Sequence, residues 1–170
     1  MSIGSELLKE LTLEASLTRR YLERIPFDQL DFKPSEKSET LGRLAVHVVE
    51  IIAWWSSLTY SNRLDFEHFQ PKDVKQKSEL LTYFDDLLVD AKKALNSIDN
   101  EDFSENWSMT HGDDILFTLP KFQVARIFCM NHLIHHRAQL GMYLRLLNIS
   151  VPASYGPSAD DEDVILIHPL

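Results

Sequence analysis

The amino-acid sequence predicts an all-α protein built as a four-helix bundle. Hydrophobic side chains recur every three or four residues in four separate stretches, each of about 20 to 28 residues. The chain has only five glycines and seven prolines, which is few for the frequent turns of an all-β sandwich. Its 170 residues are 44% hydrophobic and 25% charged, so we expect one globular domain over residues 1–170.

The first two predicted helices differ in how deeply they should be buried. Residues 5–24 carry Leu8, Leu11 and Leu22 at helical spacing, with Glu and Arg between them, which indicates an amphipathic helix. The connector IPFDQLDFKPSEKSE has two prolines and no sustained period, so it is predicted to be a loop. Thr40 can cap the next helix, LGRLAVHVVEIIAWWSSLTYS, which is apolar nearly all round and should lie deep in the structure.

The last two predicted helices follow longer connectors. The polar stretch RLDFEHFQPKD precedes a helix over roughly residues 74–98, with Asp73 as its expected cap. The irregular connector NSIDNEDFSENWSMTHGDD then leads to a fourth helix, which begins after Pro120 and ends at Asn148. These connectors, together with the four helix lengths, favour the bundle over other helical folds.

Charge and composition exclude several classes of protein. A net charge of −9, with no basic face, argues against nucleic acid as a partner. The single cysteine, Cys129, cannot form an intramolecular disulfide, and the N-terminus lacks the basic and apolar regions of a signal peptide. No uninterrupted apolar run approaches the roughly 18 residues of a membrane span. We therefore expect a cytoplasmic protein without a membrane partner.

Two histidines in the fourth helix share its apolar face. At about 100° per residue, His132 and His136 point in nearly the same direction, whereas His135 lies at the edge of that face. The side chains that share the face are Phe122, Ala125, Cys129, Leu140, Tyr143 and Leu147. Imidazoles four residues apart stand about 6 Å apart at Cβ, a spacing that lets both bind one metal ion.

A third histidine can complete such a site from the second helix. His47 is in line with Leu44, Ile51, Trp54 and Leu58, so it also projects from an apolar face. A bundle can bring the two faces together and form a three-histidine metal site with open positions. The alternative is that each histidine is an ordinary hydrogen-bonded core residue, although two buried imidazoles without partners are costly.

The residues around the histidines suggest further roles. Leu133 stands where a metalloprotease HExxH helix has its glutamate, so a catalytic base must come from elsewhere. Glu50, one turn beyond His47, is the nearest candidate; otherwise it is a solvated or salt-bridged carboxylate. Cys129 can offer a thiolate to the site or be a small apolar filler of the core.

Four more side chains are candidates for the surroundings of the ion. Trp54 and Tyr143 can wall a small-molecule pocket, as aromatic residues commonly do. Arg137 and Gln139, which stand beside the histidine pair, can orient a ligand from outside the coordination sphere. For Arg137 a surface position is the alternative.

Three segments carry a resemblance to a known family. They are FDQLDFKPSEKSETLGRLAVHV, HLIHHRAQLGMYLRLL and NISVPASYGPSADD, and the resemblance covers nearly all of the chain. The chain resembles the DinB/YfiT-like superfamily of small bacterial metalloproteins. The resemblance implies an up-down-down-up four-helix bundle, a homodimer, and a divalent metal held by His47, His132 and His136. These are the same three histidines that the face calculation selects.

The resemblance also implies a function. Some similar proteins transfer a low-molecular-weight thiol such as bacillithiol, mycothiol or glutathione, and a related branch isomerises maleylpyruvate. We therefore expect a metal-dependent S-transferase whose partners are a small electrophile and a thiol. A metal-dependent hydrolase of an ester or amide, a non-catalytic metal-binding module and a metal-free scaffold are the alternatives. Nickel or zinc is the expected ion, and imidazole ligands also suit manganese or iron.

Overall fold

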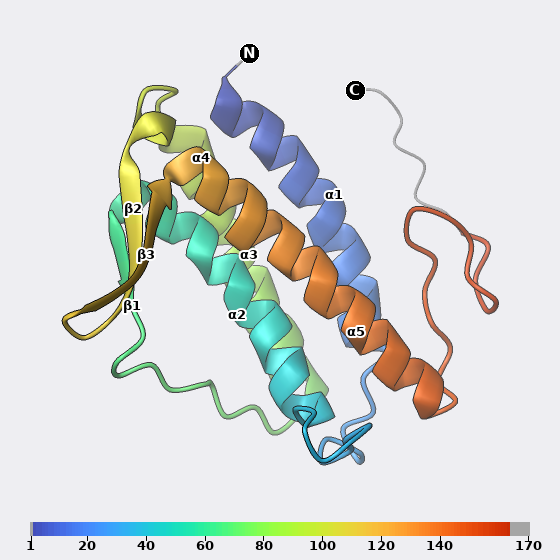
Figure 1. The fold of residues 1–170 in the computed structure, drawn as a ribbon. Helices are drawn as coiled ribbons and strands as arrows, with labels where there is room; N and C mark the ends of the chain where they lie inside the picture. The colour runs from blue at the N-terminus through green and yellow to red at the C-terminus, as the bar shows by residue number, and fades with distance from the viewer. Residues whose placement is uncertain (1, 164–170) are drawn as a thin grey trace.

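The computed structural model describes residues 2–163, in which four long helices form a bundle with a small sheet at one end (Figure 1). The helices are α1 (Ile3–Glu23), α2 (Leu41–Tyr60), α3 (Lys77–Ser97) and a fourth, continuous helix composed of α4 (Lys121–Val124), η2 (Ala125–Asn131) and α5 (His132–Leu146). In Figure 1, α1 and the fourth helix run in one direction and α2 and α3 run in the other. This is the expected up-down-down-up course.

Helix α2 is the centre of the bundle. It packs against α3 and α5, and buried residues lie on all of its sides, as its apolar sequence predicts. Thr40 is its N-cap, and the Thr40 hydroxyl accepts a hydrogen bond from the backbone N–H of Arg43 at 3.1 Å. By length and composition α2 is apolar enough to cross a membrane, contrary to the sequence-based expectation. However, 67% of its most apolar window is buried within the protein, which is typical of a core helix.

The prediction of an all-α protein misses a three-stranded sheet. The strands are β1 (Arg63–Asp65), β2 (Asn106–His111) and β3 (Asp114–Pro120), and η1 (Asp102–Ser104) is a short 3₁₀ turn before β2. β2 is central, with β1 parallel to it and β3 antiparallel. Trp107 and Met109 are buried while Asn106 and Ser108 are not, so the period-two pattern of a strand was present in the sequence. Gly112, at φ 59°, makes the β2–β3 turn.

The third helix begins three residues later than predicted. Asp73 lies outside it and forms an exposed ion pair with Lys75. Gln76 occupies the N-cap without a side-chain cap. Instead, the Glu79 carboxylate accepts hydrogen bonds from the Lys75 backbone N–H and the Gln76 amide, at 2.8 and 3.1 Å. At the end of the fourth helix, Asn148 has the left-handed φ of 57° expected for an asparagine just past a helix end.

The fourth helix contains a π-helical segment, η2, directly before the histidines. A π-helix holds more residues per turn than an α-helix, so a constant 100° per residue does not describe this stretch. Phe122, which the calculation placed on the core face, is 45% exposed. Lys121 and Val124 are buried in its place, and the Lys121 amine pairs with Glu105 at 3.0 Å. From His132 onward the helix is regular. Leu140 and Tyr143 of the predicted face are buried, but the buried face also includes Leu133, Arg137 and Leu144, so the predicted face lies at the edge of the core-facing side.

Candidate metal centre

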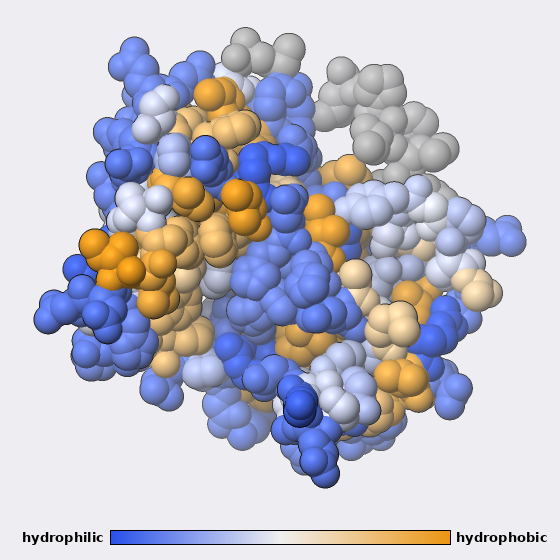
Figure 2. Space-filling view, in the orientation of Figure 1, coloured by the Kyte–Doolittle hydropathy of each residue, from blue (hydrophilic) through white to orange (hydrophobic). Residues whose placement is uncertain are grey.

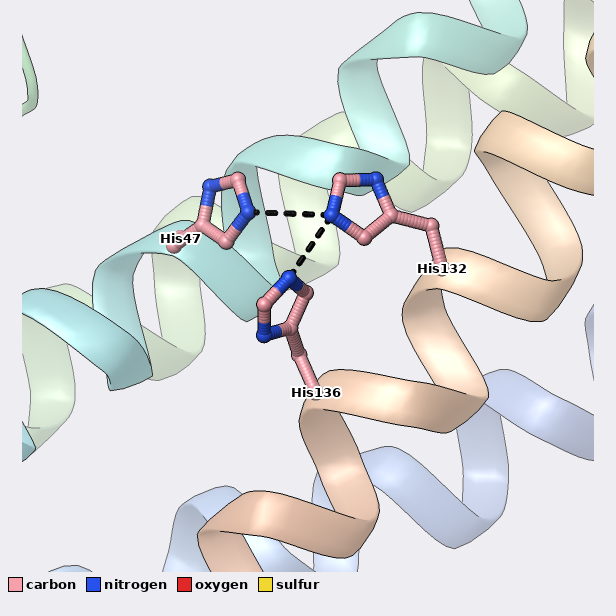
Figure 3. Close-up of side chains that lie close together, drawn as sticks. All are labelled: His47, His132 and His136. Carbon is pink, nitrogen blue, oxygen red and sulfur yellow. Dashed lines mark hydrogen bonds between the residues drawn. The ribbon is translucent and has the colours of Figure 1, made fainter. Parts of the chain in front are cut away.

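Three histidine side chains from two helices meet on one side of α2. His47 comes from the second turn of α2, His132 is the first residue of α5, and His136 follows one turn later. Figure 3 shows their rings directed toward one another. The Nε2 atom of His132 lies 3.4 Å from Nε2 of His47 and 2.7 Å from Nε2 of His136. The tertiary structure thus brings together the three histidines that the sequence singled out.

This donor set fits a divalent transition-metal ion. One nitrogen from each ring lies within 4.8 Å of the others, and each residue is half-buried. A metal–nitrogen bond of about 2.0 to 2.1 Å places tetrahedral ligand atoms roughly 3.3 Å apart, close to the observed separations. Imidazole suits zinc, nickel, copper and iron better than it suits calcium or magnesium. The group can therefore hold such an ion with small adjustments of the rings.

The surroundings keep these imidazoles neutral, which is the form that binds a metal. Burial, followed by the neighbouring His136, His132 and Arg43, lowers the pKa of His47 to about 3. Burial, followed by His136 and His135, lowers the pKa of His132 to about 4. Burial also lowers the pKa of His136, although its bond to Gln139 acts in the opposite direction. At neutral pH protons therefore do not compete with a metal ion for the three ring nitrogens.

Hydrogen bonding to the far ring nitrogen orients one of the three rings. Nδ1 of His136 donates to Oε1 of Gln139 at 2.7 Å, which leaves the lone pair of Nε2 free. This supports the orienting role predicted for Gln139. Nδ1 of His132 is buried without a well-formed hydrogen bond, and the neighbouring Phe128 carbonyl acts to raise the pKa of His132. When that nitrogen carries the proton, Nε2 of His132 is also free to bind an ion.

Aromatic side chains cover the inner side of the histidine cluster. The ring centroid of Trp54 lies 5.1 Å from that of His132 and 6.4 Å from that of His47. Phe66, which follows β1, packs edge-on against Trp54 at 5.9 Å. Trp54 is 91% shielded from solvent and forms an inner wall behind the cluster, but, contrary to the prediction, it does not line the open cavity beside the histidines. This wall limits access of water to the cluster from the side of the sheet.

A cavity of about 510 Å³ opens on the other side of the cluster. Its lining residues are Lys37, Ser38, Glu39, Arg43, Leu44, His47, His136, Gln139 and Tyr143. Tyr143 thus lines the pocket as predicted, and its hydroxyl donates to the Glu39 carbonyl at 3.0 Å. The cavity is large enough for a small molecule. Lys37 and Arg43 were missed from the sequence, although Arg43 stands one helical turn before His47 on the same face.

Glu50, the base suggested by the sequence, is bound to other groups. Its side chain is 5% exposed and does not line the cavity beside the histidines. Oε2 accepts from Nη1 of Arg43 at 2.9 Å, and Oε1 accepts from the Lys72 backbone N–H at 3.1 Å. A carboxylate with both oxygens bonded in this way holds Arg43 and the α2–α3 connector in place. The structure therefore supports the salt-bridged alternative for Glu50.

Two other candidates lie away from the cluster. Cys129 is completely buried, and burial raises the pKa of its thiol well above the ordinary value. It therefore fills space in the apolar core, which was the alternative to a thiolate role. Arg137 is buried rather than at the surface, and its Nη1 atom donates to Oε2 of Glu14 at 2.6 Å. The Tyr155 hydroxyl bridges Arg137 and Glu14. This network ties α1, α5 and the C-terminal segment together.

Comparison with known proteins gives the same family as the sequence motifs. A model of the DinB family matches residues 1–164. The uncharacterised protein YrdA of Bacillus subtilis is 23% identical over 154 residues, which are 91% of this chain and 89% of YrdA.

Two solved structures have a similar fold. The DinB-like protein YjoA of Bacillus subtilis superposes with a TM-score of 0.66 at 16% identity, covering 85% of this chain and 93% of YjoA. A DinB-like protein of Bacillus cereus superposes with a TM-score of 0.64 at 20% identity, covering 86% and 94%. These likenesses are of the fold. With the family model matching almost the whole length, the chain belongs to the DinB family.

Proposed function

We propose that this protein is a divalent-metal-dependent enzyme that acts on a small molecule bound beside His47, His132 and His136. The observation that carries the proposal is the convergence of three neutral Nε2 atoms at the edge of an open cavity. Structural zinc sites are usually closed by four protein ligands, whereas catalytic sites keep a position for water or substrate. Among the described residues, only these three histidines form such a group.

The residues around the site have separate tasks in this proposal. His47, His132 and His136 hold the ion, and Gln139 keeps the proton of His136 on Nδ1. Trp54 excludes water from the inner side, and Tyr143, fixed through Glu39, shapes the cavity. A divalent ion bound there supplies a Lewis acid that lowers the pKa of a thiol or of water. Glu50 is not given a catalytic task, because both of its oxygens are bonded elsewhere.

Thiol transfer is the reaction we put first. The support is the resemblance of the motifs to family members that transfer thiols, together with a cavity that can accept a thiol and an electrophile. Hydrolysis of a small ester or amide is the second candidate, because the same three-histidine arrangement activates water in other metalloenzymes. A thiol transferase should consume a chlorobimane only when a suitable thiol is present. A hydrolase should cleave an ester or amide without one.

The metal can be tested directly. We expect about one equivalent of nickel or zinc, or else manganese or iron, per chain when tag-free protein is examined by mass spectrometry. His136→Ala should lose most of it. His135→Ala is the matched control, because His135 is an exposed neighbour outside the cluster. If the wild-type protein holds no metal after incubation with these ions, the metal-dependent enzyme is ruled out and the metal-free scaffold is the function that fits.

We also propose that the protein is a cytoplasmic homodimer, as the resemblance implies. Hydrophobic side chains gather on the surface over the sheet end of the bundle (Figure 2). The exposed hydrophobic residues of β3 and the neighbouring helix are Ile115, Leu116, Phe122 and Ile127. A contiguous apolar surface of this kind suits a subunit interface. Light scattering coupled to size exclusion should give twice the chain mass, and Ile115→Glu together with Leu116→Glu should halve it.

A further inference from the structure

The cavity beside the histidines is more basic than the protein as a whole. The chain has 26 acidic and 17 basic residues, excluding histidine. Among the residues that line this cavity, two are basic, Lys37 and Arg43, and one is acidic, Glu39. The local excess of positive charge therefore runs against the net charge of −9. A bound divalent ion would increase this excess further.

Arg43 is held in position by a buried partner. Its Nη1 atom is bonded to Oε2 of Glu50 at 2.9 Å, and the Glu50 side chain is itself 5% exposed. Glu50 in turn is fixed by the backbone of Lys72. Only Nη1 of the guanidinium has a partner among the described residues, which leaves Nε and Nη2 without one. A guanidinium that is already fixed loses little further freedom when it binds an anion.

Arg43 lies beside the histidine cluster. It stands one helical turn before His47 on α2, and its positive charge contributes to the lowered pKa of His47, less than burial and the other two histidines do. Arg43 and His47 also line the same cavity. A ligand with one group at the histidines therefore has a second group within reach of Arg43. Guanidinium groups pair best with carboxylate or phosphate, because the donors match the acceptor oxygens in geometry and charge.

We propose that this site selects small molecules that carry a carboxylate, which binds Arg43 with help from Lys37, while the reactive group lies at the histidines. The inference rests on the proposed function for the reactive group, but anion recognition by Arg43 and Lys37 does not need the metal. Lys37 is exposed and provides long-range attraction, whereas Arg43 provides the directed contact. The site would therefore prefer an anionic thiol or substrate over a neutral one of equal size.

The experiment compares succinate with succinamide, which is similar in size but uncharged. Metal-free ¹⁵N-labelled protein is titrated with each at constant ionic strength, and the Arg43 Nε–H and Gln139 side-chain signals are followed by NMR. We expect saturable shifts with succinate and at least about tenfold weaker binding of succinamide. Phosphate forms a third arm, and tighter binding of phosphate than of succinate would overturn the assignment to carboxylates.

The variants separate charge recognition from folding. Because Arg43→Gln alone would leave the buried Glu50 carboxylate unpaired, the test uses the double variant Arg43→Gln/Glu50→Gln. This variant should lose the preference for succinate, and Lys37→Gln should lose part of it. Lys93→Gln is the matched control, because Lys93 is exposed and does not line either cavity that Arg43 lines. An undiminished preference in the double variant would overturn the proposal.

Metal content, measured on separate samples of the same proteins after incubation with nickel, zinc, manganese and iron, distinguishes this inference from the proposed function. If the protein binds none of these ions but prefers succinate, the inference stands and the proposed metalloenzyme is ruled out. If the protein binds one of them but binds succinate and succinamide equally, the metal site stands and the inference is overturned.

Discussion

Gln139 accepts a hydrogen bond from Nδ1 of His136 at 2.7 Å, and this bond directs the other ring nitrogen of His136 toward His132. Gln139 is one turn after His136 on the same helix, so the bond forms within α5 itself. The relationship is the second-sphere contact that commonly fixes the tautomer and orientation of a metal-binding histidine. It makes Gln139 a positioning residue for the candidate site.

Gln139→Met should therefore weaken metal binding without removing a ligand. The expected loss of affinity is about 10- to 100-fold, the usual effect of removing such a contact. Competition with a chromophoric chelator measures it. Gln123→Met is the control, since Gln123 is an exposed glutamine on α4. Equal affinities in wild type and Gln139→Met would show that the bond has no part in metal binding.

The buried pair of Arg137 and Glu14 should contribute strongly to stability once formed. Arg137→Met would leave the Glu14 carboxylate buried without its cation, and we expect a loss of about 3 to 5 kcal/mol in the free energy of unfolding. Glu14→Leu in addition should recover much of that loss. Urea denaturation measures both.

An exposed ion pair gives the comparison. Arg145→Met removes the pair with Asp160, which is partly exposed on both sides, and should change stability far less than Arg137→Met does. If Arg137→Met and Arg145→Met lower the free energy of unfolding by similar amounts, burial does not make the Arg137–Glu14 pair more important than an exposed pair.

The stability of the metal-free protein should fall with acidification below neutral pH. The pKa values of His47 and His132 are lowered from 6.5 to about 3 and about 4 in the folded protein, so the unfolded chain binds more protons between these limits. The contribution of the neutral histidines to the free energy of unfolding is fully present above pH 6.5 and is lost as the pH falls toward 4. Thermal unfolding in a chelator at pH 7.5 and pH 5 measures it. His47→Leu should show a smaller difference between the two pH values than wild type.

The thiol of Cys129 should be unreactive in the folded protein. It is completely buried and its pKa is raised by burial, so neither access nor thiolate is available. Ellman's reagent should react slowly with the native protein and should titrate one thiol per chain in urea. Rapid reaction of the native protein at neutral pH would mean that Cys129 is open to solvent and would reinstate it as a candidate for the site.

The sequence by itself determined the four helices and the pairing of His132 with His136. Both are local properties, because a period of 3.6 residues and a spacing of four are properties of one continuous segment. The cap at Thr40 is local for the same reason. Within the sheet, only β1 has no local signal, because it has three residues and pairs with β2 across more than 40 residues. The alternating pattern of β2 was present in the sequence but was assigned to an irregular connector.

Only the tertiary structure decided which polar groups meet. Arg137 pairs with Glu14 from the opposite end of the chain, and Glu50 turns to Arg43 and Lys72 instead of the histidines. Such contacts depend on how helices are rotated and packed against each other, which local periodicity does not specify. His47 depends on both local and tertiary structure. The sequence of α2 alone predicted the face from which it projects. Its Nε2 atom lies 3.4 Å from Nε2 of His132 only because α2 and α5 pack side by side.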